Sequence, residues 1–251
     1  MALYKSGNPA LNKQIFAKAK RIDQSEGLMT LQGTIDKVAF LLVVLALAAA
    51  YVWGLFRQSQ DFATVAPLCW IGCIGGFVVA LIIIFKQSLA PYLAPLYAML
   101  EGLALGGISA LTDRRYPGVA IQSLALTFAV FVVLVVIYKL KIIEASENFA
   151  LIVCSATGGV ALYYLFDLLL MLVGRQAPLI HSNSLLGIGF SVVVVIVASL
   201  NLVVDFDFIE QGCAKRAPKH MEWYGAFGLV VTLVWLYLEL LRLLSKLRSR
   251  D

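Results

Sequence analysis

VAPLCWIGCIGGFVVALIIIF, residues 65–85, is the stretch that decides the fold class. It contains no charged side chain, and it is long enough to cross a bilayer, since a membrane helix needs about 20 mostly apolar residues. The rest of the 251-residue chain is similar in composition: 61% of its residues are hydrophobic, 14% are charged, and the mean hydropathy is +0.88. Soluble domains are about 45–50% apolar and about 25% charged. The sequence therefore predicts an all-α integral membrane protein.

Further apolar runs of similar length predict a seven-transmembrane helix bundle. The expected spans are Val38–Phe56, Val65–Phe85, Pro91–Leu111, Val119–Tyr138, Phe149–Val173, Leu185–Val204 and Gly225–Leu244. The third span is the weakest candidate, because it contains Glu101 and two prolines near its start. Polar connections separate the runs, and the alternating pattern of an outer-membrane barrel is absent from the sequence.

The chain is expected to have two parts: a polar N-terminal segment, residues 1–34, and a seven-helix transmembrane domain, residues 35–251. Asn8-Pro9 is typical of a helix start. Apolar residues then recur at helical spacing from Leu11 to Ile22, with basic residues around them. This pattern predicts a short basic amphipathic helix lying on an anionic cytoplasmic leaflet of the lipid bilayer. A solvated cytoplasmic tail is the alternative.

The distribution of Lys and Arg predicts a cytoplasmic N-terminus. The N-terminal segment and the loops on its side of the membrane are richer in basic residues than the opposite loops. The basic C-terminal tail disagrees, because seven spans place it outside, and a last segment that bends back instead of crossing would remove the conflict. The sidedness of the C-terminus therefore stays open. The net charge of +5 is modest, and no basic patch is interleaved with exposed aromatic residues, so no nucleic-acid partner is expected.

Acidic residues within or next to the expected spans are the candidate functional residues. An ionised carboxylate at membrane depth costs several kcal/mol unless it is paired, hydrated or protonated. The residues concerned are Glu101, Asp167, Asp205, Asp207 and Glu239. Buried cations are far fewer in the sequence, and an interior rich in acids and poor in bases would favour cations or protons. We therefore predict that these carboxylates line an ion pathway or sense pH.

Each of these acids also has a simpler interpretation. Asp205 and Asp207 close the sixth apolar run, where an interfacial position is equally consistent with the sequence. Asp167 is expected to extend its carboxylate outward to the membrane surface. Glu239 has an ion-pair partner within reach in Arg242, three residues on. For Glu101, surrounded by leucines, the simpler interpretation, a merely tolerated buried acid, is the weakest of the five.

Two small-residue patterns, Gly72-x-x-x-Gly76 and Gly102-x-x-x-Gly106, predict close helix contacts, and the second turns the face next to Glu101 toward another helix. Zinc-protease, phosphate-loop and nucleophile-elbow motifs are absent from the sequence. We therefore expect neither an enzyme nor a cofactor, and no metal site is assigned. His181 and His220 are expected to be ordinary loop residues.

Five segments together resemble a known family. They are residues 8–12 (NPALN), 29–34 (MTLQGT), 97–102 (YAMLEG), 201–210 (NLVVDFDFIE) and 236–244 (LYLELLRLL). Their order and spacing over nearly the whole chain resemble the Bax inhibitor-1 (transmembrane Bax inhibitor motif) family, in its bacterial YccA-like branch. The resemblance implies a bundle with the last helix central, in a bacterial inner (plasma) membrane.

The resemblance also implies a pH-sensitive calcium leak or exchanger, gated by two carboxylates of the last two helices that share a proton. Here the pair would be Glu239 with Asp205 or Asp207, which point to nearly opposite sides of a helix. Asp205 is the expected partner. The chain departs from the family pattern by having Glu239 in place of an aspartate, and by a longer connection from Gln211 to Tyr224. A second function that the resemblance allows is a regulatory membrane protein, without transport, that binds and restrains a membrane protease.

A simple estimate of depth argues against a direct pair. Glu239 lies about 21 Å along a straight helix from Gly225, whereas Asp205 follows the sixth run directly. Straight antiparallel helices would keep the two carboxylates apart. A tilted, re-entrant or early-starting last helix would bring them together.

The predicted topology can be tested by cysteine labelling. A cysteine added at the N-terminus should react with a membrane-impermeant maleimide only after the inner membrane is permeabilised, because the basic segment is retained inside. The unmodified chain, with its native cysteines Cys69, Cys73, Cys154 and Cys213, provides the background signal. Labelling of the added cysteine in intact spheroplasts would show that the orientation is reversed.

Overall fold

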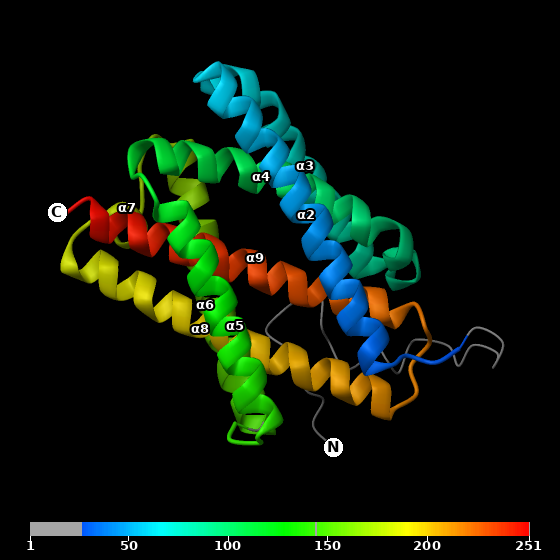
Figure 1. Cartoon of the computed structure of the whole chain (residues 1–251). Coiled ribbons are helices and arrows are strands. Elements are labelled where there is room, and N and C mark those ends of the chain that lie inside the picture. The colour runs from blue at the N-terminus through cyan, green and yellow to red at the C-terminus, as the bar shows by residue number, and fades with distance from the viewer. Residues whose placement is uncertain (1–26, 144, 251) are drawn as a thin grey trace. The chain divides into compact units, whose positions relative to one another are not determined.

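The structure is a computed structural model that describes residues 27–143 and 145–250. Its helices are α2 (Leu31–Ser59), α3 (Phe62–Phe85), the short 3-10 helix η2 (Gln87–Leu89), α4 (Ala90–Arg115), α5 (Val119–Lys139), α6 (Glu147–Leu172), α7 (Pro178–His181), α8 (Leu185–Ala214) and α9 (Met221–Arg248) (Figure 1). Within the described residues, seven of these helices are long and apolar enough to cross a membrane. The predicted all-α fold with seven spans is confirmed.

The helices α8 and α9 extend beyond the expected spans. Hydropathy ends the sixth span at Val204, but α8 continues to Ala214, because Phe208 and Ile209 are buried and Gln211 donates a hydrogen bond to Asp207 one turn earlier. The helix α9 starts at Met221 instead of Gly225. The connection that looked unusually long is therefore mostly helix, and only residues 215–220 join the two helices.

The first span also begins earlier than predicted. The helix α2 starts at Leu31, and the side chain of Thr30 caps it by accepting a hydrogen bond from the Gly33 N–H at 3.0 Å. Residues 31–34, which the sequence assigned to the polar segment, are therefore helical. The predicted amphipathic helix between Pro9 and Ile22 lies outside the described residues.

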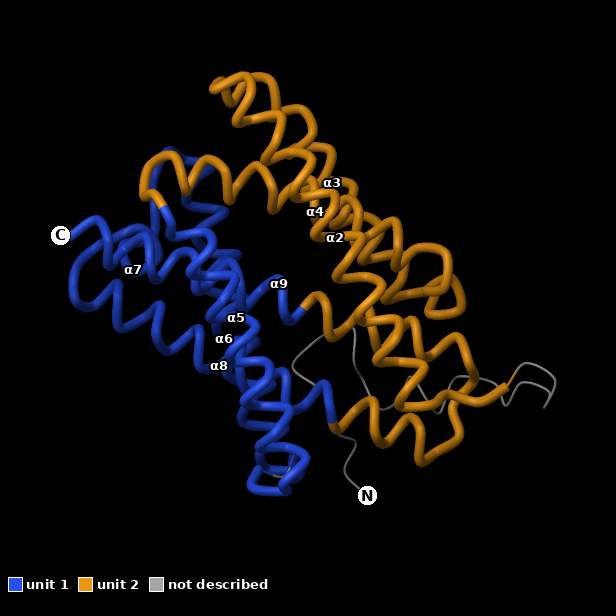
Figure 2. Tube along the Cα trace, in the orientation of Figure 1, with its two compact units in different colours: residues 1–8, 118–206, 232–251 blue, residues 9–117, 207–231 orange. Residues whose placement is uncertain are grey.

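The described chain forms two compact units (Figure 2). Unit 1 contains residues 118–206 and the chain from Thr232 onward, and unit 2 contains residues up to Pro117 together with Asp207–Val231. In unit 2, α4 packs against both α2 and α3 around a core that includes Val52, Val65 and Ala110. In unit 1, α6 and α8 pack through Ala150, Val153 and Val204.

Glycines bring the helices of unit 2 into backbone contact. A Cβ atom at Gly102 would lie 2.3 Å from the carbonyl oxygen of Leu45 on α2, and one at Gly106 would lie 2.5 Å from that of Ala49. On α3, a Cβ at Gly72 would lie 2.5 Å from the carbonyl oxygen of Leu100. No larger residue fits at these places without a shift of the backbone. The predicted contacts through small residues are confirmed.

Glu222, in the first turn of α9, joins three parts of unit 2. Its side chain is fully buried, and its Oε1 accepts hydrogen bonds from the backbone N–H and the hydroxyl of Thr30, at 2.9 and 2.8 Å. Lys37 of α2 donates to its Oε2. The carboxylate thus completes the N-terminus of α2, where backbone N–H groups favour an anion. The adjacent Met29 N–H donates to the carbonyl oxygen of Ala217 at 2.8 Å, which fixes the chain entering α2 to the loop before α9.

The helix α9 is the most buried of the seven membrane-spanning helices. In its most apolar stretch of 18 residues, 67% of the residues are buried, as expected for a central helix. It is one unbroken helix of 28 residues, about 42 Å long. The helix is uninterrupted, and a last segment that returns the basic tail to the N-terminal side stays a prediction.

Changing Glu222 should destabilise the protein measurably. We expect Glu222→Gln to lower the melting temperature in detergent by roughly 5–10 °C, because Lys37 loses its buried partner and the N-terminus of α2 loses its anion. Gly33→Ala should act in the same direction, since a Cβ there would lie 2.4 Å from Oε1 of Glu222. The matched control is Glu147→Gln, which removes an exposed glutamate from a helix start. Equal melting temperatures for Glu222→Gln and the control would show that the contact is not stabilising.

Candidate functional site: a buried charge network in unit 1

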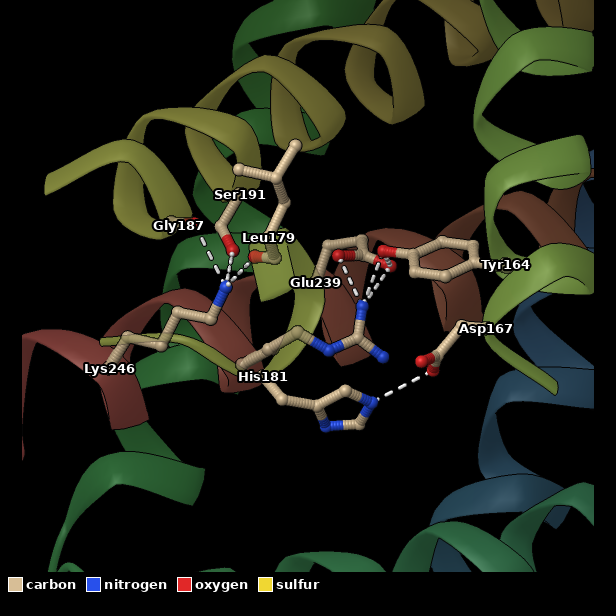
Figure 3. A network of polar contacts seen from close by, with 9 residues as sticks. Tyr164, Asp167, Leu179, His181, Gly187, Ser191, Glu239 and Lys246 are labelled. Carbon is tan, nitrogen blue, oxygen red and sulfur yellow. Dashed lines mark hydrogen bonds and ion pairs between the residues drawn. The ribbon is translucent and has the colours of Figure 1, made fainter. Parts of the chain in front are cut away.

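Glu239 lies on the part of α9 that belongs to unit 1, and its side chain is only 2% exposed. The hydroxyl of Tyr164, on α6, donates to its Oε1 at 2.7 Å. Arg242 donates from Nη1 to both carboxylate oxygens at 2.8 Å, and the guanidinium lies over the Tyr164 ring, 5.0 Å from its centroid (Figure 3). The predicted i,i+3 ion pair between Glu239 and Arg242 is confirmed, and Tyr164 ties it to a second helix.

Asp167, one turn after Tyr164 on α6, is also buried, at 7% exposure. Its carboxylate accepts the Ala177 N–H at 2.7 Å and contacts Nε2 of His181 at 2.8 Å. The carboxylate finds its partners in the segment that connects α6 to α8, and its extension to the membrane surface stays a prediction. His181 is not an ordinary loop residue, because it belongs to this contact.

Lys246 is the member of the network that the sequence did not reveal. It is 5% exposed, and its ammonium donates to the carbonyl oxygens of Leu179 and Gly187, at 3.0 and 2.9 Å, and to the Ser191 hydroxyl at 2.9 Å. These three acceptors use all three N–H groups of the ammonium. A signal was present in the sequence: Lys246 follows Glu239 by seven residues and so lies on the same face of α9. Hydropathy alone places Lys246 in the basic tail.

The Glu239–Arg242 pair, the Asp167–His181 pair and Lys246 form one electrostatic network (Figure 3). The Arg242 guanidinium lies within electrostatic range of Asp167 and of Lys246, and Lys246 is also within range of Glu239. Two carboxylates therefore face two basic side chains, Arg242 and Lys246, and His181 contacts one of these carboxylates. The expectation of an interior rich in acids and poor in bases is wrong for this network, because both basic side chains come from the last turns of α9.

The aspartates of α8 differ from each other in environment. Asp205, in unit 1, is 0% exposed. Asp207, in unit 2, is half-buried and accepts a hydrogen bond from Gln211 at 2.6 Å. Asp205 is therefore buried within the protein, and α8 continues past it for more than two turns.

The contacts of Lys246 define how α8 and α9 align in unit 1. They set position 246 of α9 level with residues 187–191 of α8. Counting back along both antiparallel helices, Glu239 is level with about residue 196, and Asp205 lies about nine residues, or about 14 Å, further along α8. The alignment therefore does not favour a direct hydrogen bond between Asp205 and Glu239, and the carboxylate of Glu239 is instead bonded to Tyr164 and Arg242.

Glu101 lies in unit 2, on α4, and is half-buried. A Cβ atom on Gly76 of α3 would lie 3.0 Å from its Oε2, so the carboxylate lies directly against the neighbouring helix. This agrees with the predicted close contact of that face. One turn earlier, the buried ring of Tyr97 packs edge-on against Phe227, with ring centroids 4.9 Å apart. Within the described residues, no group of three or more His, Cys, Asp and Glu side chains is arranged to hold a metal ion.

These features define a multi-pass helical membrane protein with a buried charge network on its most buried helix. The family model described as Bax inhibitor 1 like matches residues 8–249. The chain belongs to this family, as the sequence segments indicated, and its assignment to the YccA-like branch stays a prediction. No curated protein matches the chain.

A double-mutant cycle can measure the ion pair. Arg242→Gln should lower the free energy of unfolding by about 2 kcal/mol, because it leaves the Glu239 carboxylate buried without its cation. Glu239→Gln should cost less, since the Arg242 side chain is 36% exposed and can reach water. The double change should recover much of the loss caused by Arg242→Gln.

Thermal unfolding followed with a thiol-reactive dye at the native cysteines is a suitable measurement. Arg175→Gln, at an exposed arginine, is the matched control. Strictly additive losses in the cycle would mean that the pair contributes no coupling energy.

Proposed function

We propose that this protein is a calcium-conducting cation leak of the bacterial inner membrane, whose opening responds to pH through the Glu239 network. The observation that carries the proposal is the burial of Glu239, at 2% exposure, in the most buried helix, with partners from its own helix and from α6. Ionisable residues at membrane depth are expensive and commonly mark ion pathways or proton relays. Membership of the Bax inhibitor 1 like family supports the same function.

The network gives a physical route from pH to helix packing. The ionised Glu239 holds Arg242 and accepts the Tyr164 hydroxyl, so it connects α9 to α6. Protonation of Glu239 removes the charge that holds Arg242. Arg242 then still donates to the Tyr164 hydroxyl and faces Asp167, itself held by Ala177 and His181, and the basic side chain of Lys246. A proton on Glu239 therefore weakens the contact between α6 and α9 and changes the charge along the path.

Asp205 is the second ionisable group proposed for this pathway. Its complete burial on α8 supports a role inside the protein. Because the alignment of α8 and α9 sets Asp205 and Glu239 about 14 Å apart along the axis, we propose that they act at two successive levels. Asp207, half-buried and bonded to Gln211, is given a smaller role, and Glu101 is proposed to contribute from unit 2.

The proposal is tested by calcium flux into liposomes that contain only this protein and a trapped calcium indicator. Flux should depend on pH, and Glu239→Gln should flatten this response, because an amide at this position cannot change its charge. Asp205→Asn should lower flux, and its effect should add to that of Glu239→Gln, since separated sites act independently. Glu101→Gln tests the contribution of unit 2, and Glu147→Gln, at an exposed site, is the matched control.

Two results would contradict parts of the proposal. Non-additive effects of Asp205→Asn and Glu239→Gln would favour the directly coupled pair that the family resemblance implies. Absence of flux above empty liposomes at every pH, with the protein folded, would exclude the leak and favour the regulatory role, in which the protein restrains a membrane protease.

A further inference from the structure

Asn201 is a buried amide with one unsatisfied end. It lies on α8 in unit 1, one turn before Asp205, and is 1% exposed. Its Nδ2 donates to the Thr157 hydroxyl oxygen on α6 at 2.7 Å and to the carbonyl oxygen of Val197 at 2.8 Å. These bonds use both amide hydrogens. The buried Oδ1 accepts no hydrogen bond from any described residue.

The orientation of this amide is fixed by its neighbours. The Thr157 hydroxyl hydrogen is already donated to the carbonyl oxygen of Val153, at 2.8 Å, so the Thr157 oxygen is left to accept. A flipped amide would place Oδ1 against this oxygen and against the carbonyl of Val197, where no donor exists. The hydrogen-bond network therefore assigns Nδ2 to these two contacts and leaves Oδ1 as the unsatisfied end.

An unsatisfied buried acceptor costs about 1–3 kcal/mol, and water is scarce at membrane depth. Four residues on, Asp205 is 0% exposed. Side chains at i and i+4 share one helix face, with Cβ atoms about 5–6 Å apart. The amide oxygen of Asn201 and the carboxylate of Asp205 therefore project from the same face of α8. Amide and carboxylate oxygens are the ligands that hard cations such as Ca²⁺ prefer.

We propose that Asn201 Oδ1 and the Asp205 carboxylate are two ligands of a cation-binding site inside unit 1, at which a hard cation exchanges part of its hydration shell for protein oxygens. The role of the site in conduction rests on the proposed leak, whereas cation binding does not. Two side chains with a single negative charge between them make a weak site. Weak binding is what a conduction path requires, because an ion must enter readily and also leave.

Asn201→Leu is a clean test of the amide oxygen. The substitution is similar in size and leaves no donor unpaired, because the Thr157 hydroxyl keeps its bond to Val153. Asn201→Asp adds a second carboxylate at the same position. Ser199→Ala is the matched control, since this hydroxyl, on the same helix, bonds only the carbonyl oxygen of Val195.

The measurement is equilibrium binding of ⁴⁵Ca²⁺ to the detergent-purified full chain, with thermal unfolding as the check on folding. We expect Asn201→Leu to weaken Ca²⁺ binding about tenfold and Asn201→Asp to strengthen it about tenfold, as for the loss or gain of one ligand, with less than about a twofold change for Ser199→Ala. Parallel flux measurements should show a lower calcium flux for Asn201→Leu.

Failure of the site and failure of the leak give different results. Wild-type protein that binds no Ca²⁺ at millimolar concentration, or that binds it as tightly as folded Asn201→Leu, overturns the site and leaves Oδ1 to a buried water. Wild-type protein that binds Ca²⁺ through Asn201 but carries no flux overturns the leak and leaves the site standing. Normal flux in Asn201→Leu with unchanged binding overturns the site alone.

Discussion

The ion pair between Arg242 and Glu239 is the interaction on which the polar interior of unit 1 depends. A lone carboxylate at this depth would cost several kcal/mol, and the guanidinium removes most of that cost through contacts with both carboxylate oxygens at 2.8 Å. Because Tyr164 donates to the same carboxylate, the pair also fixes α6 against α9. The contacts of Asp167 with Ala177 and His181 then follow from the position of α6.

The buried charges of both units are satisfied in related ways, through helix ends and backbone groups. Glu222 binds the N-terminus of α2, where free N–H groups favour an anion. Lys246 binds carbonyl oxygens of Leu179 and Gly187, which lie at the connection between α7 and α8. Each charge thus joins segments that are distant in the sequence. The same groups that lower the cost of burial therefore also determine which helices meet.

The sequence predicted the spans well because lipid imposes one strong requirement, a long apolar run in a helix. It failed at helix ends, where that requirement stops. Asp205 marks the end of the apolar run, but α8 continues, because Phe208 and Ile209, on the same side of the helix as the buried Asp205, also bury their side chains. Hydropathy averages over all faces of a helix and cannot detect such a continuation.

The site was predicted only where the partners lie close together in the chain. The spacing of three residues between Glu239 and Arg242 was sufficient to predict their contact. The partners of Asp167 and Lys246 are backbone groups and side chains of the segment before and at the start of α8, and no spacing rule predicts them. Sequence reasoning therefore did not predict the contacts of Asp167 and Lys246.

The glutamate at position 239, where the family resemblance implies an aspartate, has a physical role in the same network. Relatives are expected to have an aspartate where this chain has Glu239. A glutamate carboxylate lies one C–C bond further from the helix backbone, about 1.5 Å. That extra reach lets it meet both Arg242, on its own helix, and the Tyr164 hydroxyl, on α6. An aspartate at 239 would have to give up one of these contacts. The longer side chain and the arginine three residues on therefore act together. Arg242, on the same helix, balances the charge of the Glu239 carboxylate, and the same carboxylate accepts the Tyr164 hydroxyl of α6.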